Sequence, residues 1–409
     1  MKQAIKQVTA MLHHHKHSTL KVLLLTFLGM LSQAVYAQNN LDEFLSLVEQ
    51  NNQELKAAYK LMEAQQMGFQ TGLTPDNPSI GYGHFPGKQE DIGNKTTYGI
   101  SQSFDFPTVY SVRKKLANDQ SQLSEYEYQL FRQAKLLEAQ LGFYQYAYLL
   151  KKQRILQKRL EHAEKLYQSY QTKFERGNAS VLDVNKARIQ YLKTKSNNQL
   201  LAQELNAQQR DLQLLSGQTL DTLVIISSAK NELPAMETIL SDMQQLQPEV
   251  RYLQQAQQVA DRQIKLAKQN WLPEFELAYE SEKAGDGTYR GVRGGLSIPL
   301  WKDKNKVKQA KAQAIFEEQR YSSRLSSLIS ETQKRYTQAE ELNKIRKEYN
   351  QTLEEAANIG FLDKALRLGR LSVIDYFNEL AFYYETIDTA MEIENNYLQT
   401  LAKLQSYKL

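Results

Sequence analysis

The chain has 409 residues, with 51 Lys and Arg against 46 Asp and Glu, no cysteine and only 8 prolines. The absence of cysteine excludes a disulfide framework, a thiolate zinc site and a cysteine nucleophile. The formal net charge of +5 suggests a nucleic-acid or anionic-membrane partner only if the basic residues belong to the mature chain.

The first 37 residues have the pattern of a secretory signal. Four lysines precede a short apolar run over 22–31, and Val35-Tyr36-Ala37 offers small residues for cleavage. The run of about 10 residues is too short to cross a bilayer as a helix, which needs about 20. We therefore expect an exported chain that begins at Gln38, with a retained amphipathic helix as the alternative. The leader contains Lys2, Lys6, Lys16, Lys21, His13, His14, His15 and His17. Its removal leaves a nearly neutral chain, so a nucleic-acid partner is not expected.

Two long stretches without proline, 108–233 and 300–409, are rich in helix-forming residues. Apolar residues in the first stretch recur every seven positions in two series, which is typical of coiled-coil packing. The series are Val109, Leu116, Leu123, Leu130, Leu137 and Tyr144, and Ala134, Leu141, Tyr148 and Ile155. The spacing predicts a helix over about 108–175, roughly 100 Å long at 1.5 Å per residue.

A glycine turn is expected where this helix ends, at Arg176-Gly177-Asn178. Ser180 is placed to cap the next helix, with Asp183 three residues later as its capping-box partner. That second helix is expected to end near Gly217, because glycine commonly follows the last helical residue. The two helices together predict a very long helical hairpin.

The second half of the chain repeats the first. The pattern Gly-x-x-Ser-x-x-Asp at 177–183 recurs at 369–375, and the same offset of 192 carries Pro107 onto Pro299. Such a repeat indicates duplication of one structural unit, and the sequence predicts a mixed α+β, mainly α fold. We expect repeat 1 over 38–217, with a strand pair at 79–106 and a helical hairpin at 108–217. An equatorial linker is expected over 218–247. Repeat 2 is expected over 248–409, with a strand pair at 274–299 and a hairpin at 302–409.

The strand pairs alternate apolar and polar residues over runs of about 8–11 residues, as transmembrane barrel strands do. A half-buried soluble hairpin has the same pattern. Trp271 and Trp301 flank one pair at the same end, which fits an aromatic girdle at a membrane interface; core packing at the strand–helix junction is the alternative. A group of basic residues follows each strand pair, and it could contact lipid phosphates or form a solvated face. These residues are Arg113, Lys114, Lys115, Lys302, Lys304, Lys306, Lys308 and Lys311.

Four strands cannot close a membrane barrel, for which the minimum is about eight. An open sheet edge is not tolerated in lipid either, because its backbone groups would stay unpaired. The membrane interpretation therefore requires an oligomer.

These features in this order resemble the TolC family of outer-membrane efflux proteins over essentially the whole mature chain. The resemblance implies a homotrimer whose twelve strands form one β-barrel in the outer membrane of a Gram-negative bacterium. An antiparallel coiled-coil α-barrel would continue this β-barrel through the periplasm. The short sequence, which ends level with Gly217 of the first hairpin, is more similar to the heavy-metal-efflux branch than to the drug-efflux branch.

The resemblance also implies roles for individual residues. The tip turns would dock onto a periplasmic adaptor protein that works with an inner-membrane pump, through Gly177, Asn178, Ser180, Gly369, Arg370, Leu371 and Ser372. A periplasmic gate would contain Asp375, Asn378 and Asp183, although helix capping alone explains Asp183. Three Asp375 carboxylates on a trimer axis would repel one another and attract cations. The barrel lumen would contain Asp105, Glu276, Glu280 and Arg293, and the interface belt Trp271 and Trp301.

The sequence thus favours a passive exit duct for small substrates, metal cations or drugs, across the periplasm and the outer membrane. A type I secretion outlet of the same fold is one alternative. A soluble periplasmic coiled-coil adaptor is another, and it predicts extraction without detergent. An enzyme, a cofactor or a metal site is not expected, because no phosphate loop or nucleophile–base pair is present, and His84 and His162 lack a partner at ligand spacing.

Overall fold

The computed structural model describes residues 39–88, 93–218, 232–301, 303–356 and 359–409. The predicted signal peptide, its histidines, Lys302 and much of the predicted linker lie outside these ranges. The helices are α2 (Asn39–Asn51), α3 (Gln53–Phe69), α4 (Pro107–Glu175), α5 (Val181–Ser216), α6 (Met236–Leu246), α7 (Pro248–Gln269), α8 (Lys306–Ala356), α9 (Ile359–Arg367), α10 (Val373–Leu404) and the short η1 (Ser406–Lys408). The strands are β1 (Ser79–Phe85), β2 (Lys95–Phe104), β3 (Glu274–Ala284) and β4 (Gly287–Ser297).

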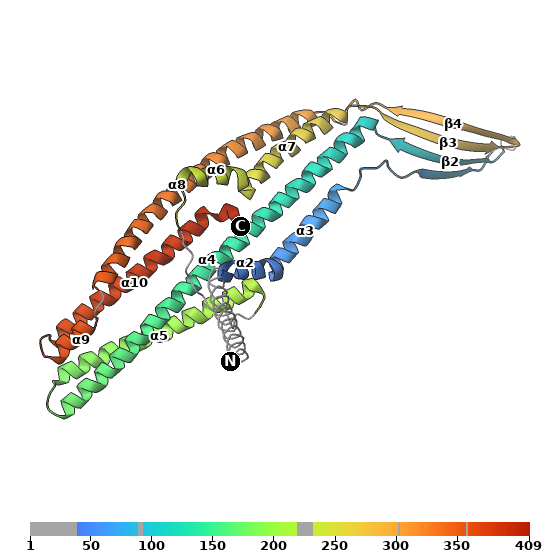
Figure 1. Ribbon diagram of the computed structural model, residues 1–409. Helices are drawn as coiled ribbons and strands as arrows, with labels where there is room; N and C mark the ends of the chain where they lie inside the picture. The colour runs from blue at the N-terminus through green and yellow to red at the C-terminus, as the bar shows by residue number, and fades with distance from the viewer. Residues whose placement is uncertain (1–38, 89–92, 219–231, 302, 357–358) are drawn as a thin grey trace, which may run out of the picture.

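The molecule is elongated, with the sheet at one end and the turns of two helical hairpins at the other (Figure 1). This arrangement confirms the predicted mainly α fold with four strands. Helix α4 alone has 69 residues, about 100 Å at 1.5 Å per residue. Pro107 opens it, a position where the missing N–H of proline costs no hydrogen bond.

The four strands form one antiparallel sheet in the order β1-β2-β3-β4, so β1 and β4 are its edges. Alternation sends large apolar side chains to one face, where Ile80 is 84% and Val292 79% exposed. The other face carries small and polar residues. Gly81, Gly99 and Gly291 lie in one cross-strand row there with Glu280 between the last two.

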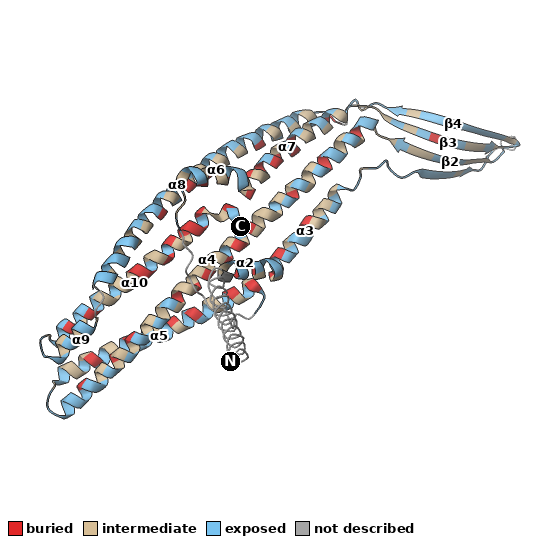
Figure 2. Ribbon diagram, in the orientation of Figure 1, coloured by how far each residue is buried: buried red, intermediate tan, exposed pale blue. Residues whose placement is uncertain are grey.

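The hydrophobic core is divided into two clusters at equivalent positions of the two halves (Figure 2). The first cluster contains Leu136 and Leu212, and the second contains Leu328 and Leu404, each 192 residues later. Upstream of the strands the offset becomes 195, as it does from Val48 of the first cluster to Met243 of the second. The duplication visible in the sequence is therefore a duplication of the packed core.

The buried stripe of α4 agrees with the predicted heptad seam at its start but not near the middle of the helix. Leu136 and Phe143 are buried, whereas the predicted Leu137 and Tyr144 are half-buried and Ala134 is exposed. Helix α4 packs against α5, α7, α3 and α10, so several neighbours determine which residues are covered. The prediction identified the long helix correctly, and Val109 and Leu116 of its series are buried, but near the middle of the helix the buried positions precede the series by one residue.

Candidate functional site: the hairpin tips and the sheet

The turn between α4 and α5 is built around a left-handed glycine. Gly177 has φ 74°, a conformation that glycine adopts without a Cβ clash. The N–H of Asn178 donates to the carbonyl of Lys173 at 2.7 Å, and that of Gly177 to Phe174 at 2.9 Å. This pattern closes a helix by satisfying its last carbonyl groups.

The turn between α9 and α10 repeats this construction at the offset of 192. Gly369 has φ 67°, and the N–H of Arg370 donates to the carbonyl of Ala365 at 3.0 Å. The N–H of Gly369 donates to Leu366 at 3.2 Å. Both predicted docking tips are therefore the same rigid turn presented twice.

Serine caps start the helix after each turn, as the spacing predicts. At α5 the N–H of Asp183 donates to Ser180 Oγ at 3.2 Å, and the N–H of Ser180 donates to Asp183 Oδ2 at 3.1 Å. At α10 the N–H of Asp375 donates to Ser372 Oγ at 3.1 Å, while that hydroxyl donates to Asp375 Oδ2 at 2.6 Å. Capping thus accounts for both carboxylates in the isolated chain.

Large apolar side chains are exposed around both tips. Leu182 is 65% and its counterpart Ile374 is 50% exposed, and Phe174 and Leu368 are exposed close to the two glycines. Groups of exposed apolar residues are a common feature of surfaces where proteins contact each other. Residue periodicity had not singled out these four side chains, although their position beside the repeated motif could have done so.

Two of the three predicted gate residues lie along one exposed face of α10. Asp375 and Asn378 are exposed and three residues apart, and the exposed Phe382 follows on the same face. Asp183 belongs to the other hairpin, at the start of α5. One chain therefore presents two separate acidic positions, each at the start of a long helix.

Three of the predicted lumen residues form one ion cluster on the polar face of the sheet. Arg293 Nε donates to Glu280 Oε1 at 2.9 Å, and its Nη2 donates to Glu276 Oε1 at 3.1 Å. Asp105 lies apart from this cluster, one residue beyond the end of β2, where it pairs with Arg113 at 2.8 Å. Trp271 and Trp301 lie just outside β3 and β4, at the end of the sheet that joins the helices.

A polar cluster that the sequence had not revealed joins α4 to the second hairpin near its tip. Tyr376 is fully buried, and its hydroxyl donates to Asp363 Oδ1 at 2.6 Å. His162 Nε2 lies 3.1 Å from that hydroxyl and 3.3 Å from the same carboxylate oxygen. Burial, followed by the Asp363 carboxylate, raises the pKa of Tyr376 far above its usual value. His162 thus has polar partners, from residues 201 and 214 positions later.

Two further ion pairs continue this connection along α4 and α10. Both terminal nitrogens of Arg159 donate to Asp388, at 2.9 and 2.8 Å, and the guanidinium lies 4.2 Å from the ring centre of Tyr384. Lys151 pairs with Glu394 at 2.6 Å. Burial raises the pKa of Tyr384 to about 12. The two hairpins of one chain are therefore held together by charged contacts as well as by apolar packing.

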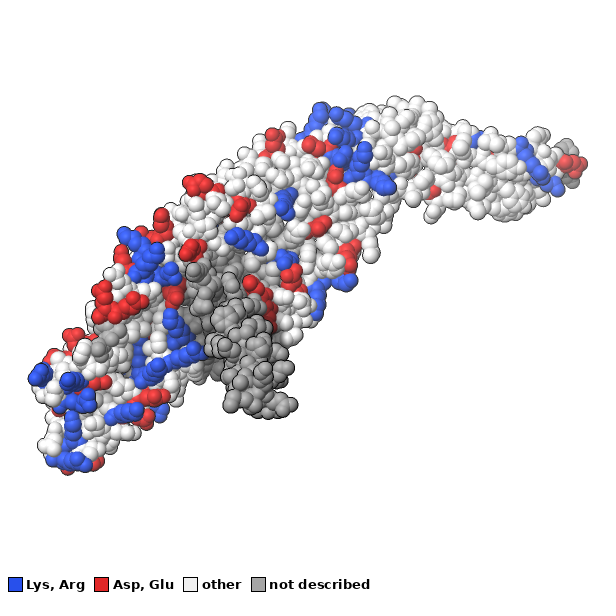
Figure 3. Space-filling view, viewed as in Figure 1, with Lys and Arg blue, Asp and Glu red and all other residues white. Residues whose placement is uncertain are grey.

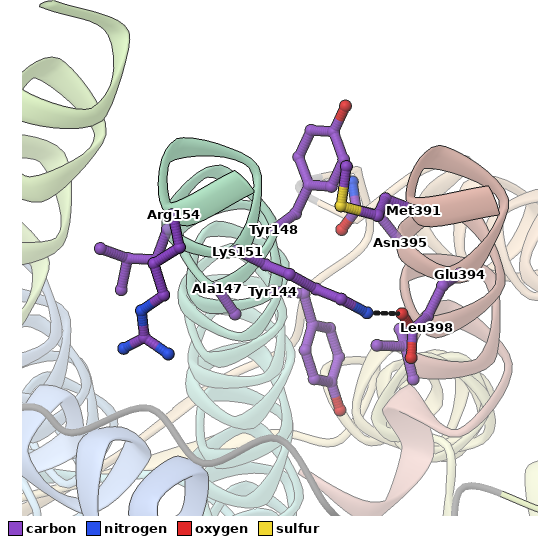
Figure 4. A pocket seen from close by; sticks show the side chains of 10 residues that line it. Tyr144, Ala147, Tyr148, Lys151, Arg154, Met391, Glu394, Asn395 and Leu398 are labelled. Atoms are coloured by element: carbon purple, nitrogen blue, oxygen red, sulfur yellow. Dashed lines mark hydrogen bonds and ion pairs between the residues drawn. The ribbon is translucent and has the colours of Figure 1, made fainter. Parts of the chain in front are cut away.

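A groove of about 320 Å³ lies between α4 and α10 (Figure 4). Lys151 reaches across it to Glu394, Tyr144 and Tyr148 line it, and Arg154 points away from it (Figure 4). The groove presents an ion pair and aromatic rings but no nucleophile next to a general base.

Within the described ranges, no three His, Cys, Asp or Glu side chains are grouped as a metal site requires. None of the helices in the described part of the chain is both long and apolar enough to cross a membrane.

Comparison with known proteins finds a family model that matches part of the chain and solved structures that share its fold. Residues 44–218 match the family model of the outer membrane efflux protein, and the expected resemblance is confirmed. Among solved structures, CusC is 14% identical with a TM-score of 0.76, over 90% of this chain and 92% of that chain. A membrane protein from Pseudomonas aeruginosa is 13% identical with a TM-score of 0.76, over 90% of both chains.

The CmeC outer membrane channel of Campylobacter jejuni is 16% identical with a TM-score of 0.71, over 90% of this chain and 85% of that chain. At these identities the likeness establishes a shared fold. No curated protein sequence matches the chain significantly.

Proposed function

We propose, from the match of residues 44–218 to the outer membrane efflux protein family model, that this chain is the outer-membrane channel of a tripartite efflux system. The channel is a passive exit duct for small substrates, which a periplasmic adaptor and an inner-membrane pump deliver to it. The fold shared with solved outer-membrane channels supports this proposal.

The sheet is the observation that carries the proposal. Its apolar face is exposed, with Ile80, Tyr82 and Val292 among the outward side chains, and such a surface is unfavourable in water but suits lipid. Its edges β1 and β4 have no strand partner within the described chain, which lipid does not tolerate. Edge-to-edge joining of copies satisfies both constraints. In a soluble adaptor this apolar face would be exposed to water, which is unfavourable, so the sheet supports the channel over the adaptor.

The remaining parts of the molecule fit a trimer of such chains. Three copies supply twelve strands, enough for a closed barrel, and the long hairpins continue it as an α-barrel that extends through the periplasm. The tips at Gly177 and Gly369 then form the far end, where the exposed Leu182 and Ile374 meet the adaptor. Asp375 of each copy contributes to the gate.

The substrate follows from the pump rather than from a binding site in the duct. On the polar sheet face, Glu276 and Glu280 share the single positive charge of Arg293, so this cluster gives the lumen a small negative charge. That charge is compatible with metal cations and with cationic drugs. A type I secretion outlet has the same fold and would differ only in its partners.

Cysteine cross-linking of the sheet edges tests the assembly, because the chain contains no native cysteine. Ser79→Cys on β1 is combined in turn with Gly291→Cys, Arg293→Cys or Gly295→Cys on β4, all on the polar face. Since β1 and β4 are opposite edges of one chain, a disulfide between them joins two copies.

We expect one of the three pairs to give covalent trimers in oxidised outer-membrane fractions. The matched control is Ser79→Cys with Ser101→Cys, which are aligned on neighbouring strands and should give only an intrachain bond. Monomers from all three pairs, or a chain recovered wholly from the soluble periplasm, would overturn the proposal.

Adaptor docking is tested separately at the tip. Gly369→Trp should abolish co-purification of the adaptor while trimers still form, because a bulky side chain blocks close approach to the turn. Gly285→Trp is the matched control, since Gly285 also has a positive φ, 56°, but lies in the turn between β3 and β4. Full adaptor binding by the Gly369 variant would contradict the assignment of the tips.

A further inference from the structure

Seven exposed lysines surround the helix ends that adjoin the sheet. They are Lys114 and Lys115 of α4, Lys265 and Lys268 of α7, and Lys304, Lys308 and Lys311 at the start of α8, and we call them the lysine collar. Figure 3 shows a patch of basic side chains where α7 and α8 approach the sheet, beside a sheet surface that is mostly uncharged up to its far tip. Positive charge is thus concentrated at one level of the molecule.

Three acidic side chains at this level are paired with cations outside the collar. Asp105 pairs with Arg113, Asp119 with Arg262 and Asp303 with Lys306. Across the described ranges, the ion pairs include no member of the lysine collar. The collar therefore presents seven lysines that no ion pair of the described residues neutralises.

Two collar residues share one face of α8. Lys308 and Lys311 are three residues apart, which places them on one side of the helix, and Lys304 lies in the turn just before α8; all three are exposed. Val307 and Ala310, between them in sequence, are half-buried, so the lysines are turned away from the packed side. Lysines at a helix N-terminus oppose the helix dipole, and a negatively charged partner would compensate for this.

The order of residue types from the sheet to the collar matches a membrane boundary. The chain passes from the exposed Ile298 and Leu300 to Trp301, which is 80% exposed, and then to Lys304. Trp271, 48% exposed, lies at the same end of the neighbouring strand. Indole rings favour the interfacial region, and lysines beyond them reach the phosphate layer.

We infer that the lysine collar binds the phosphate groups of anionic phospholipids in the leaflet that faces the helices. This inference rests on the proposed membrane position of the sheet. It adds a lipid selectivity to that position: the collar prefers anionic over zwitterionic headgroups, and the preference depends on salt.

The two tryptophans make the test specific, because Trp271 and Trp301 are the only ones in the chain and both lie beside the collar. The full chain is reconstituted in phosphatidylcholine vesicles that contain increasing fractions of brominated phosphatidylglycerol or brominated phosphatidylcholine. Bromine quenches indole fluorescence at contact, so the two titrations report which lipid occupies the collar. We expect a preference for the anionic lipid of about fivefold or more, the equivalent of one lysine near an anionic surface.

The variant Lys304→Gln, Lys308→Gln, Lys311→Gln should reduce this preference toward equality. The matched control is Lys334→Gln, Lys344→Gln, Lys347→Gln, three exposed lysines of the same helix farther from the sheet, and it should keep the wild-type preference. About 1 M salt should abolish the preference of the unmodified chain, since the screening length is then only about 3 Å.

Three outcomes would count against the inference, and they separate it from the proposed function. Equal quenching by both lipids in the unmodified chain refutes the collar while leaving the sheet in the membrane. A loss of preference in the Lys334, Lys344 and Lys347 variant shows that general charge, not the collar, is responsible. Absence of quenching by either lipid places the tryptophans outside the membrane and refutes the proposed function as well.

Discussion

Removing the hydroxyl of Tyr376 should loosen the second hairpin tip and leave the first unchanged. In Tyr376→Phe the ring remains, but the hydrogen bonds to Asp363 at 2.6 Å and to His162 at 3.1 Å are lost. A hydrogen bond to a charged group contributes about 1.5–3 kcal/mol. Asp363 is 39% exposed and can recover water, so the lower end applies. We expect a loss of about 1.5 kcal/mol, or roughly a tenfold rise in local opening.

Amide hydrogen exchange of the assembled protein measures this opening directly. Peptides from 359–380 should exchange about ten times faster, whereas those from 173–190 at the other tip should not change. Tyr383→Phe is the matched control on the same helix. Within the described ranges Tyr383 contacts the ring of Tyr384 through its own ring, and phenylalanine keeps that ring. Equal protection of 359–380 in Tyr376→Phe and the unmodified chain would refute the energetic role assigned to the hydroxyl.

Three further predictions concern the caps, the turns and pH. Ser180→Ala should cost about 1 kcal/mol through loss of the N-cap, seen as faster exchange in the first turn of α5 only. Gly177→Ala should lower the free energy of unfolding by about 1–2 kcal/mol, because φ at Gly177 is 74° even though no atom would obstruct an added Cβ. Gly68→Ala is the control, since an added Cβ is equally unobstructed there inside α3, and it should leave the unfolding temperature unchanged or raise it. Burial raises the pKa of Tyr384 and Tyr407 to about 12 from 10. Their neutral forms therefore stabilise the fold below pH 10, and this stabilisation is lost as the pH rises from 10 to 12. The unfolding temperature should fall over this pH range, and it should fall less in Tyr384→Phe.

Local signals in the sequence were sufficient for the helices and their caps. Helix α4 extends from Pro107 to Glu175, within one residue of the prediction, because proline and the glycine turn specify its two ends. The Ser180 capping box is likewise a contact between residues three positions apart. Strand ends were less certain: β4 was expected to extend to 299 but ends at Ser297, since alternation does not show where pairing stops and Pro299 has no N–H to donate.

Contacts between distant segments could not be predicted in the same way. The pair Arg159–Asp388 joins residues 229 positions apart, and neither residue belongs to a motif. His162 seemed isolated for the same reason, because Asp363 and Tyr376 reach it only through packing of α9 and α10. The buried stripe of α4 depends on helices from both halves of the chain, so a single heptad series could not define it. The roles proposed for Asp375 and Asn378 stay predictions about an assembly of several chains.

The row of Gly81, Gly99 and Gly291 on the polar face of the sheet offers positions where substitutions could change the width of the proposed duct during evolution. At these glycines the sheet surface is backbone alone, whereas Glu280 projects from the same row between Gly99 and Gly291. Nothing lies within 4 Å of a Cβ added at Gly81 or Gly291, so a larger residue can be introduced there without disturbing the wall. In the proposed trimer each such change enters the lumen three times. Under that proposal, single substitutions in this row narrow the exit in graded steps, and permeability can be adjusted independently of the fold.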